Sequence, residues 1–177
     1  YFKKNIPVDT YGFSKYVIAK DIESKKRNIF NLRVFGIFGK YEDYKRRFIS
    51  NNICRVICNL DISINKNMYF DYIYVNDFCK IIGILLDKNP IHRSYNICAN
   101  ESIDLLSLAH IIKEIAGGKA KIAVKEKGLR QEYSGDNTRF VKEFGKFHYT
   151  NYRQAISDLY QWYASPKNIN LNSVDFL

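Results

Sequence analysis

The hydrophobic and polar positions of this chain follow two periods in alternation, which predict helices and strands in turn. Apolar residues recur every three to four positions in several segments, as expected for helices with one buried face. These predicted helices cover residues 10–26, 45–58, 78–87, 105–116 and 152–163, with a shorter one between Asp136 and Gly145. Short apolar or alternating runs predict strands at residues 29–35, 62–64, 68–75, 94–98 and 120–124. Because the two kinds of element alternate, the fold class is α/β.

Helix-capping residues stand at the expected start of two helices. Asp9 and Thr10 can cap the first helix, and Asn76 or Asp77 can cap the helix at 78–87. These side chains accept hydrogen bonds from the free N–H groups of the first turn, so they mark where a helix begins.

The strand predicted at 29–35 is apolar along most of its length, which predicts that both of its faces are buried. Gly36 and Gly39 follow it and bracket a turn in which the backbone can approach a ligand closely. At the other end of the chain, residues 167–177 show no clear pattern.

The composition is that of a folded protein. Of the 177 residues, 46% are hydrophobic and 15% aromatic, which excludes a disordered chain. No run approaches the roughly 20 apolar residues of a membrane span, and the polar, Lys-bearing start does not resemble a signal peptide. The four Cys lie in apolar runs, and neither they nor the three His have the spacing of metal ligands. We therefore expect a cytoplasmic protein that has no membrane anchor and binds no metal.

The formal net charge of +10 leaves two classes of partner open. A basic surface permits binding to nucleic acid, although the Lys residues are spread along the chain instead of gathering on one element. The same surface suits a small anionic substrate such as a nucleotide diphosphate.

Candidate chemistry lies in the stretch Tyr11-Gly12-Phe13-Ser14-Lys15. Tyr11 and Lys15 are four residues apart, so on a helix their side chains share one face. A Lys ammonium near a phenol favours the phenolate and lowers the pKa of a tyrosine. Such a tyrosine can pass a proton to or from a sugar or alcohol oxygen. The spacing alone also fits an ordinary solvated helix face.

Several motifs in a fixed order resemble the extended short-chain dehydrogenase/reductase family, which includes nucleotide-sugar epimerases, dehydratases and reductases. The helix with YGFSK precedes the strand LRVFGIFG, and FDYIYVND resembles the family's strand and helix cap "RDFIYVDD". Further along, YNI resembles "YNIG", and the segment from Arg130 to Gly145 resembles "R…D.sk…lG". The last helix, 152–163, resembles the family's closing helix.

The resemblance implies roles at the cofactor, NAD or NADP. It makes Tyr11 the catalytic acid/base and places Lys15 on the nicotinamide ribose, where its charge assists Tyr11. It also places the backbone of Phe35, at the end of the strand, beside the nicotinamide.

The resemblance also implies a nucleotide-sugar substrate, with Gly36 in the substrate site. Arg46, Arg47 and Arg130 are candidates for binding the diphosphate, because a guanidinium fork suits that group. Two positions depart from the family: Gly36 stands where Asn is common, and Phe70 replaces the Arg of "RDFIYVDD". These departures make the type of sugar nucleotide an open question.

The family begins with a strand, a Gly-rich turn and a helix that bind the pyrophosphate of the cofactor. None of the nine Gly residues forms that fingerprint. We therefore expect residues 1–40 to supply the last helix and strand of a Rossmann-type domain, 41–166 the smaller α/β substrate-binding part, and 167–177 a tail. In this reading the chain is the C-terminal part of a homodimeric enzyme and is catalytic only together with the upstream part.

Two other readings stay open. One is a truncated, non-catalytic substrate-binding remnant that retains the YGFSK motif by descent. The other is a basic nucleic-acid-binding module, whose binding to any duplex would depend steeply on salt.

Overall fold

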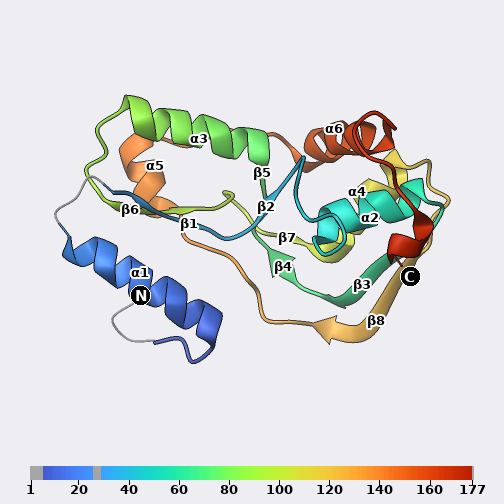
Figure 1. Ribbon diagram of the computed structural model, residues 1–177, viewed down its shortest axis with the longest axis horizontal. Helices are drawn as coiled ribbons and strands as arrows, with labels where there is room; N and C mark the ends of the chain where they lie inside the picture. Colours follow the sequence, from blue (N-terminus) through green and yellow to red (C-terminus); the bar gives the residue numbers. More distant parts are fainter. Residues whose placement is uncertain (1–5, 26–28, 177) are drawn as a thin grey trace.

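The computed structural model describes residues 6–25 and 29–176, and the predicted alternation of strands and helices is confirmed (Figure 1). The elements in chain order are α1 (Thr10–Ser24), β1 (Asn31–Val34), β2 (Ile37–Phe38), α2 (Phe48–Ile57), β3 (Ile62–Asn67), β4 (Tyr69–Phe70), β5 (Ile73–Tyr74), α3 (Val75–Asp87), β6 (Ser94–Ile97), β7 (Ile103–Asp104), α4 (Leu105–Ile115), β8 (Ile122–Leu129), α5 (Thr138–Phe144), α6 (Tyr152–Ala164) and the 3-10 turn η1 (Ser173–Phe176). Helix α1 ends at Ser24, and the predicted end at residue 26 lies outside the described residues.

The described strands pair two by two. Parallel pairs join β1 with β6, β2 with β5 and β3 with β8, while β4 pairs with β7 in antiparallel register. Helices α3 and α5 lie on one side of the β1–β6 pair, and α1 lies on the other side (Figure 1). Helices α2, α4 and α6 gather at the opposite end of the molecule, next to β3 (Figure 1).

The prediction of one continuous strand at 68–75 is wrong. The chain pairs with β7 through β4, then breaks at Asp71 and Tyr72, and pairs with β2 through β5. Asp71 is buried at the break, and its carboxylate accepts a hydrogen bond of 2.6 Å from the Gly135 N–H. Alternation identified the extended backbone, but it could not show that the two halves belong to different strand pairs.

Other boundaries also differ from the prediction. Residues 37 and 38 of the predicted turn form β2, which pairs with β5, and β8 extends to Leu129. Helix α2 begins at Phe48, because the preceding residues form turns. Segment 173–176 forms η1, and Phe176 is buried in the core.

The helix cap predicted at Asn76 or Asp77 is also wrong, because α3 begins at Val75 with Tyr74 as its N-cap. Asp77 lies in the first turn, is fully buried, and accepts hydrogen bonds from the N–H and hydroxyl of Thr150 at 2.7 and 3.0 Å. By contrast, Asp9 caps α1 as expected, accepting a 2.7 Å hydrogen bond from the Gly12 N–H. Both aspartates accept hydrogen bonds from backbone N–H groups. Asp9 accepts from its own helix, α1, whereas Asp77 accepts from a residue outside α3.

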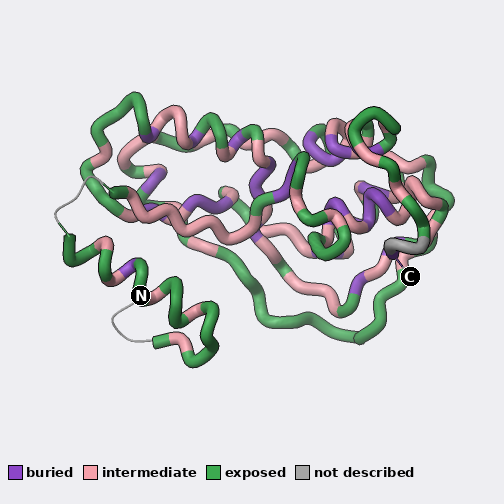
Figure 2. The backbone as a smooth tube through the Cα atoms, viewed as in Figure 1, coloured by how far each residue is buried: buried purple, intermediate pink, exposed green. Residues whose placement is uncertain are grey.

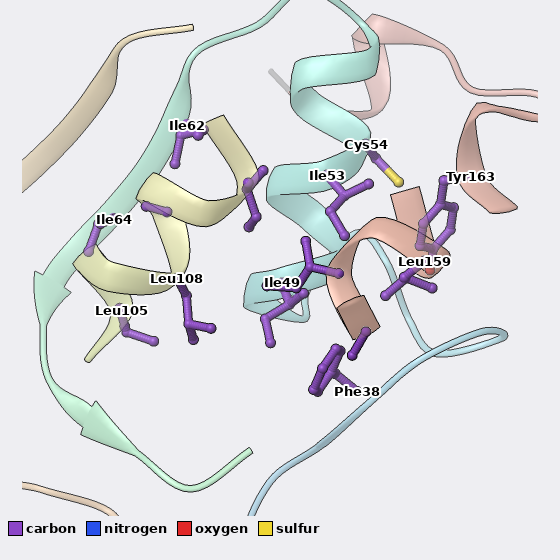
Figure 3. Packing of buried hydrophobic residues seen from close by; sticks show 14 of the residues in the cluster. Phe38, Ile49, Ile53, Cys54, Ile62, Ile64, Leu105, Leu108, Leu159 and Tyr163 are labelled. Carbon is purple, nitrogen blue, oxygen red and sulfur yellow. The ribbon is translucent and has the colours of Figure 1, made fainter. Parts of the chain in front are cut away.

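The main hydrophobic core lies between α2, α4, α6 and β3. Ile49 and Ile53 of α2 pack with Leu108 of α4 and Leu159 of α6, and all four side chains are at most 1% exposed (Figure 3). A second cluster joins α3 and α5 to the β1–β6 pair and contains Tyr95. Packing in the first core holds α2 in place at one end of the molecule. Packing in the second cluster holds β1 in place at the other end.

The four residues of β1 are half-buried in this chain, so burial of this strand on both faces stays a prediction for the assembled enzyme. Its Arg33 side chain donates hydrogen bonds to Asn96 and Ser94 of the neighbouring strand at 2.6 and 2.5 Å. Helix α1 contributes a single fully buried side chain, Ala19, and exposes most of its surface (Figure 2).

Candidate active site

An open cavity of about 870 Å³ lies where β1 runs into β2. Its lining comes from the start of α1, from β1 and β2, from the loop leading into α2, from β4 and its continuation, and from the segment that follows β8. Segments far apart in the sequence therefore meet at one place. The lining includes Tyr11, Phe35, Gly36 and Arg47, four of the seven residues that the sequence nominated.

Tyr11 lies in the first turn of α1, where its side chain is 74% exposed and lines the cavity. Lys15 is one turn further along the same helix, and its Nζ lies 5.5 Å from the centre of the Tyr11 ring. This separation allows a cation–π contact. The predicted common helix face for the two side chains is therefore confirmed, while their catalytic roles stay a prediction.

Phe35 and Gly36 follow β1 and form the floor of the cavity with β2. The Gly36 carbonyl oxygen accepts a 2.9 Å hydrogen bond from the Ile73 N–H. A Cβ atom on Gly36 would collide with the Asp71 carbonyl oxygen and lie 2.8 Å from the Phe70 ring. No side chain fits here, so Gly36 could serve a ligand only through its backbone.

The three arginines nominated for a diphosphate do not all line the cavity. Arg47 lines the cavity, whereas the side chain of Arg46 is 86% exposed and lies 3.6 Å from the Asp43 carboxylate. Arg130 is exposed and is not part of the cavity lining. Its backbone N–H donates a 2.9 Å hydrogen bond to Asn67, at the end of β3. Substrate binding by Arg46 and Arg130 stays a prediction.

The cavity has an aromatic wall that the sequence reading missed, made of the rings of Phe35, Tyr133, Phe70 and Tyr72. Neighbouring ring centres along it are 5.7, 5.0 and 4.6 Å apart. Such spacings are typical of favourable aromatic pairs. The sequence contained only part of the information that predicts this wall. Phe70 stands out because it replaces the family's Arg, but no periodicity links it to Tyr133, which lies 63 residues later.

Glu42 is a second cavity residue that the sequence reading missed. It follows the turn at Gly39, and its Oε1 atom accepts hydrogen bonds from the Ser50 hydroxyl and from the Gly39 N–H at 3.3 Å. Burial raises the pKa of the Glu42 carboxyl, and these two donors and the charge of Arg47 only partly offset that effect. The cavity thus holds a carboxyl group whose ionised form is disfavoured.

The raised pKa of Glu42 predicts a pH-dependent stability. Because the folded state binds this proton more tightly than the unfolded chain, the free energy of unfolding should fall as pH rises above the ordinary Glu pKa of 4.5, until the raised pKa is passed. Glu42→Gln cannot ionise, so its stability relative to the wild type should increase across that window. Denaturant unfolding of both proteins at a series of pH values measures this difference, and a difference that does not change with pH would contradict the prediction.

Residues 3–98 match the model of the NAD dependent epimerase/dehydratase family. The chain belongs to this family. This confirms the resemblance noted in the sequence, and the matched part includes Tyr11, Lys15 and the FDYIYVND segment.

Solved structures share the fold of this family member. The dTDP-glucose 4,6-dehydratase of Bacillus anthracis, solved with NAD, is 19% identical and superposes with a TM-score of 0.75 over 92% of this chain and 53% of that one. The UDP-glucose 4-epimerase of Thermotoga maritima, solved with UDP-glucose, is 15% identical, with a TM-score of 0.70 over 86% of this chain and 52% of that one.

A third solved structure has the same fold as these two. The UDP-glucuronic acid 4-epimerase of Bacillus cereus, a mutant solved with a substrate analogue and NAD, is 16% identical, with a TM-score of 0.71 over 89% of this chain and 53% of that one. The chain therefore spans about half the length of the solved proteins it matches. None of the described helices is both long enough and apolar enough to cross a membrane.

Proposed function

We propose that this member of the NAD dependent epimerase/dehydratase family forms the part of a nucleotide-sugar epimerase, dehydratase or reductase that carries the catalytic tyrosine and the substrate cavity. The observation that carries the proposal is the position of Tyr11, which faces the cavity and has the Lys15 ammonium 5.5 Å from its ring. A proton donor and acceptor beside a cavity of about 870 Å³ suits proton transfer at a substrate hydroxyl.

In this proposal Tyr11 accepts or returns the proton of a sugar hydroxyl, and Lys15 stabilises the negative charge that develops on the phenol oxygen. The residues present fit the nicotinamide end of the cofactor: Tyr11, Lys15 and the backbone at Phe35 would hold it. NAD or NADP, when bound there, supplies hydride transfer at the sugar carbon. Arg47 is the guanidinium that lines the cavity and would bind the diphosphate.

The pyrophosphate of the cofactor needs a different binding element. It is held by backbone N–H groups of a Gly-rich turn at a helix N-terminus, and none of the nine Gly residues forms such a turn sequence. We propose that polypeptide other than these 177 residues supplies it. A non-catalytic substrate-binding remnant is the second candidate, because the same missing fingerprint favours it.

If other polypeptide binds the pyrophosphate, the 177-residue chain alone should not bind NADH or NADPH with micromolar affinity. The reason is that Tyr11 and Lys15 reach only one end of the dinucleotide. Calorimetric titration of the isolated chain measures this. Micromolar binding by the isolated chain would show that the pyrophosphate site lies within it.

Turnover separates the two candidate functions. The chain would be joined to a dinucleotide-binding half of a family member, and conversion of nucleotide sugars would be followed in the presence of NAD. We expect conversion of at least one nucleotide sugar. If the assembled protein binds NAD and nucleotide sugar but converts none, the non-catalytic candidate is the correct one.

A further inference from the structure

We propose that Phe176 is a positioning residue for the cavity, because its contact with Tyr44 holds the turn at residues 43–47 that carries Arg47. Phe176 lies in η1, at the end of the C-terminal segment 165–176, and it does not line the cavity. It therefore acts through Tyr44 and touches no ligand itself. The effect on the substrate rests on the role proposed for Arg47, whereas the contact between the segment and the turn does not.

The turn at residues 43–47 has one side at the cavity and the other at the main core. The N–H groups of Arg46 and Arg47 both donate to the Asp43 carbonyl oxygen, at 3.0 and 2.9 Å, which closes the turn. Asp43 and Arg47 line the cavity, whereas Tyr44 is half-buried and packs against the main core. A change in the position of Tyr44 therefore also moves Arg47 relative to the cavity.

Tyr44 contacts two aromatic rings from the C-terminal part of the chain. Its ring centre lies 6.0 Å from that of Tyr163 in α6 and 6.0 Å from that of Phe176 in η1. Such distances are typical of favourable aromatic pairs. Both partners are buried. Because Tyr163 belongs to a helix of the main core, Phe176 is the partner whose contact can be removed separately.

Phe176 is the residue that anchors the C-terminal segment. Among the residues of 165–176 whose burial the structure describes, Phe176 alone is buried. Its carbonyl oxygen accepts a 2.6 Å hydrogen bond from Nη1 of Arg55 in α2, and η1 lies beside that helix (Figure 1). Segments that bury few side chains can open without unfolding the rest of a protein. Loss of the Phe176 ring should therefore loosen the segment and Tyr44 while the core stays folded.

The loop around this turn depends on contacts with other elements. The Asn51 side chain of α2 donates to the Lys45 carbonyl oxygen at 3.0 Å, which ties the backbone of the turn at one point, and Tyr44 ties it at another. Before the turn, Tyr41 has a left-handed φ of 69°, which is unfavourable for a residue with a Cβ atom. Its ring meets that of Trp162 in α6, with 5.1 Å between the ring centres. The loop is thus positioned by its neighbours, and loss of one attachment should change its order.

The test measures amide hydrogen exchange in the 177-residue chain, without cofactor or substrate. In Phe176→Ala, the Arg46 and Arg47 amides should exchange about 10- to 150-fold faster than in the wild type, the ratio that corresponds to burial of one Phe side chain. The amides of α4 should keep their wild-type rates, because the core stays folded. Phe140→Ala is the matched control and should leave the Arg46 and Arg47 rates unchanged, because Phe140 is also buried but belongs to the second cluster.

Two further variants show whether the effect passes through Tyr44. Tyr44→Ala already removes the ring that Phe176 contacts, so adding Phe176→Ala to it should cause no further acceleration. Phe176→Leu keeps most of the apolar volume and should exchange at rates between those of the wild type and Phe176→Ala.

Kinetics of the assembled enzyme distinguish a positioning role from a structural one. Phe176→Ala should raise KM for the nucleotide sugar, because the turn carries Arg47, the residue proposed to bind the diphosphate. It should leave kcat and KM for NAD unchanged, because Tyr11 and Lys15 lie on α1 and not on the turn.

Several results would overturn the inference: unchanged exchange of the Arg46 and Arg47 amides in Phe176→Ala, equal acceleration in α4, or additive effects of Tyr44→Ala and Phe176→Ala. Equal acceleration would make Phe176 an ordinary core residue, and additivity would show that it does not act through Tyr44. Faster exchange with an unchanged KM would remove the positioning role. The exchange measurement needs no turnover, so a failure of the proposed function is seen separately, as an assembled protein that converts no nucleotide sugar.

Discussion

Tyr11→Phe is expected to reduce turnover of the assembled enzyme by about 10²–10⁴-fold, which is the usual contribution of a positioned acid/base. Tyr11 lines the cavity, and the substitution removes its phenol oxygen while keeping the ring beside Lys15. Because Tyr11 is 74% exposed and packs little, the free energy of unfolding should not change. Steady-state kinetics with a converted nucleotide sugar, together with thermal unfolding, measures both quantities.

A neighbouring tyrosine on the same helix provides the control. Tyr16 lies on α1 but is not part of the cavity lining. Its ring stacks with that of Phe13, and the two ring centres are 6.4 Å apart. Tyr16→Phe should therefore leave turnover unchanged. Wild-type turnover in Tyr11→Phe, or an equal loss in both variants, would remove Tyr11 from the role of acid/base.

Gly36→Ala is expected to lower the free energy of unfolding by about 1–3 kcal/mol, the typical cost of adding a methyl group where there is no space. The new Cβ would collide with the carbonyl oxygen of Asp71, a backbone atom that cannot rotate away, and with the ring of Phe70. Denaturant unfolding of Gly36→Ala and of the wild type measures this difference.

Gly83 offers a matched control with the opposite sign. It lies within α3, and a Cβ atom added there would meet no heavy atom within 4 Å. Gly83→Ala should raise stability by about 0.5–1 kcal/mol, because Ala costs less conformational entropy than Gly in a helix. If Gly36→Ala were as stable as Gly83→Ala, the close packing of strand, carbonyl and ring described here would be wrong.

Local patterns were sufficient for the class of the fold and for one pair of site residues. Helix periodicity and capping residues depend on neighbours within one or two turns, so α1, its cap at Asp9 and the common face of Tyr11 and Lys15 followed from the sequence. The order of the motifs was also sufficient to indicate the family, which the match over residues 3–98 confirms.

Only the tertiary structure decided which distant groups meet. Asp77 has the chemistry of a helix cap, but its burial beside Thr150 depends on a segment 73 residues away. The same holds for the broken strand at Asp71, for Glu42 with its raised pKa, and for the contact between Phe70 and Tyr133. Hydrophobic periodicity specifies which face of an element is buried, but not the partner against which it is buried. The cavity consists of such partners, so its aromatic wall and its carboxyl group became visible only when the strands and loops were placed together.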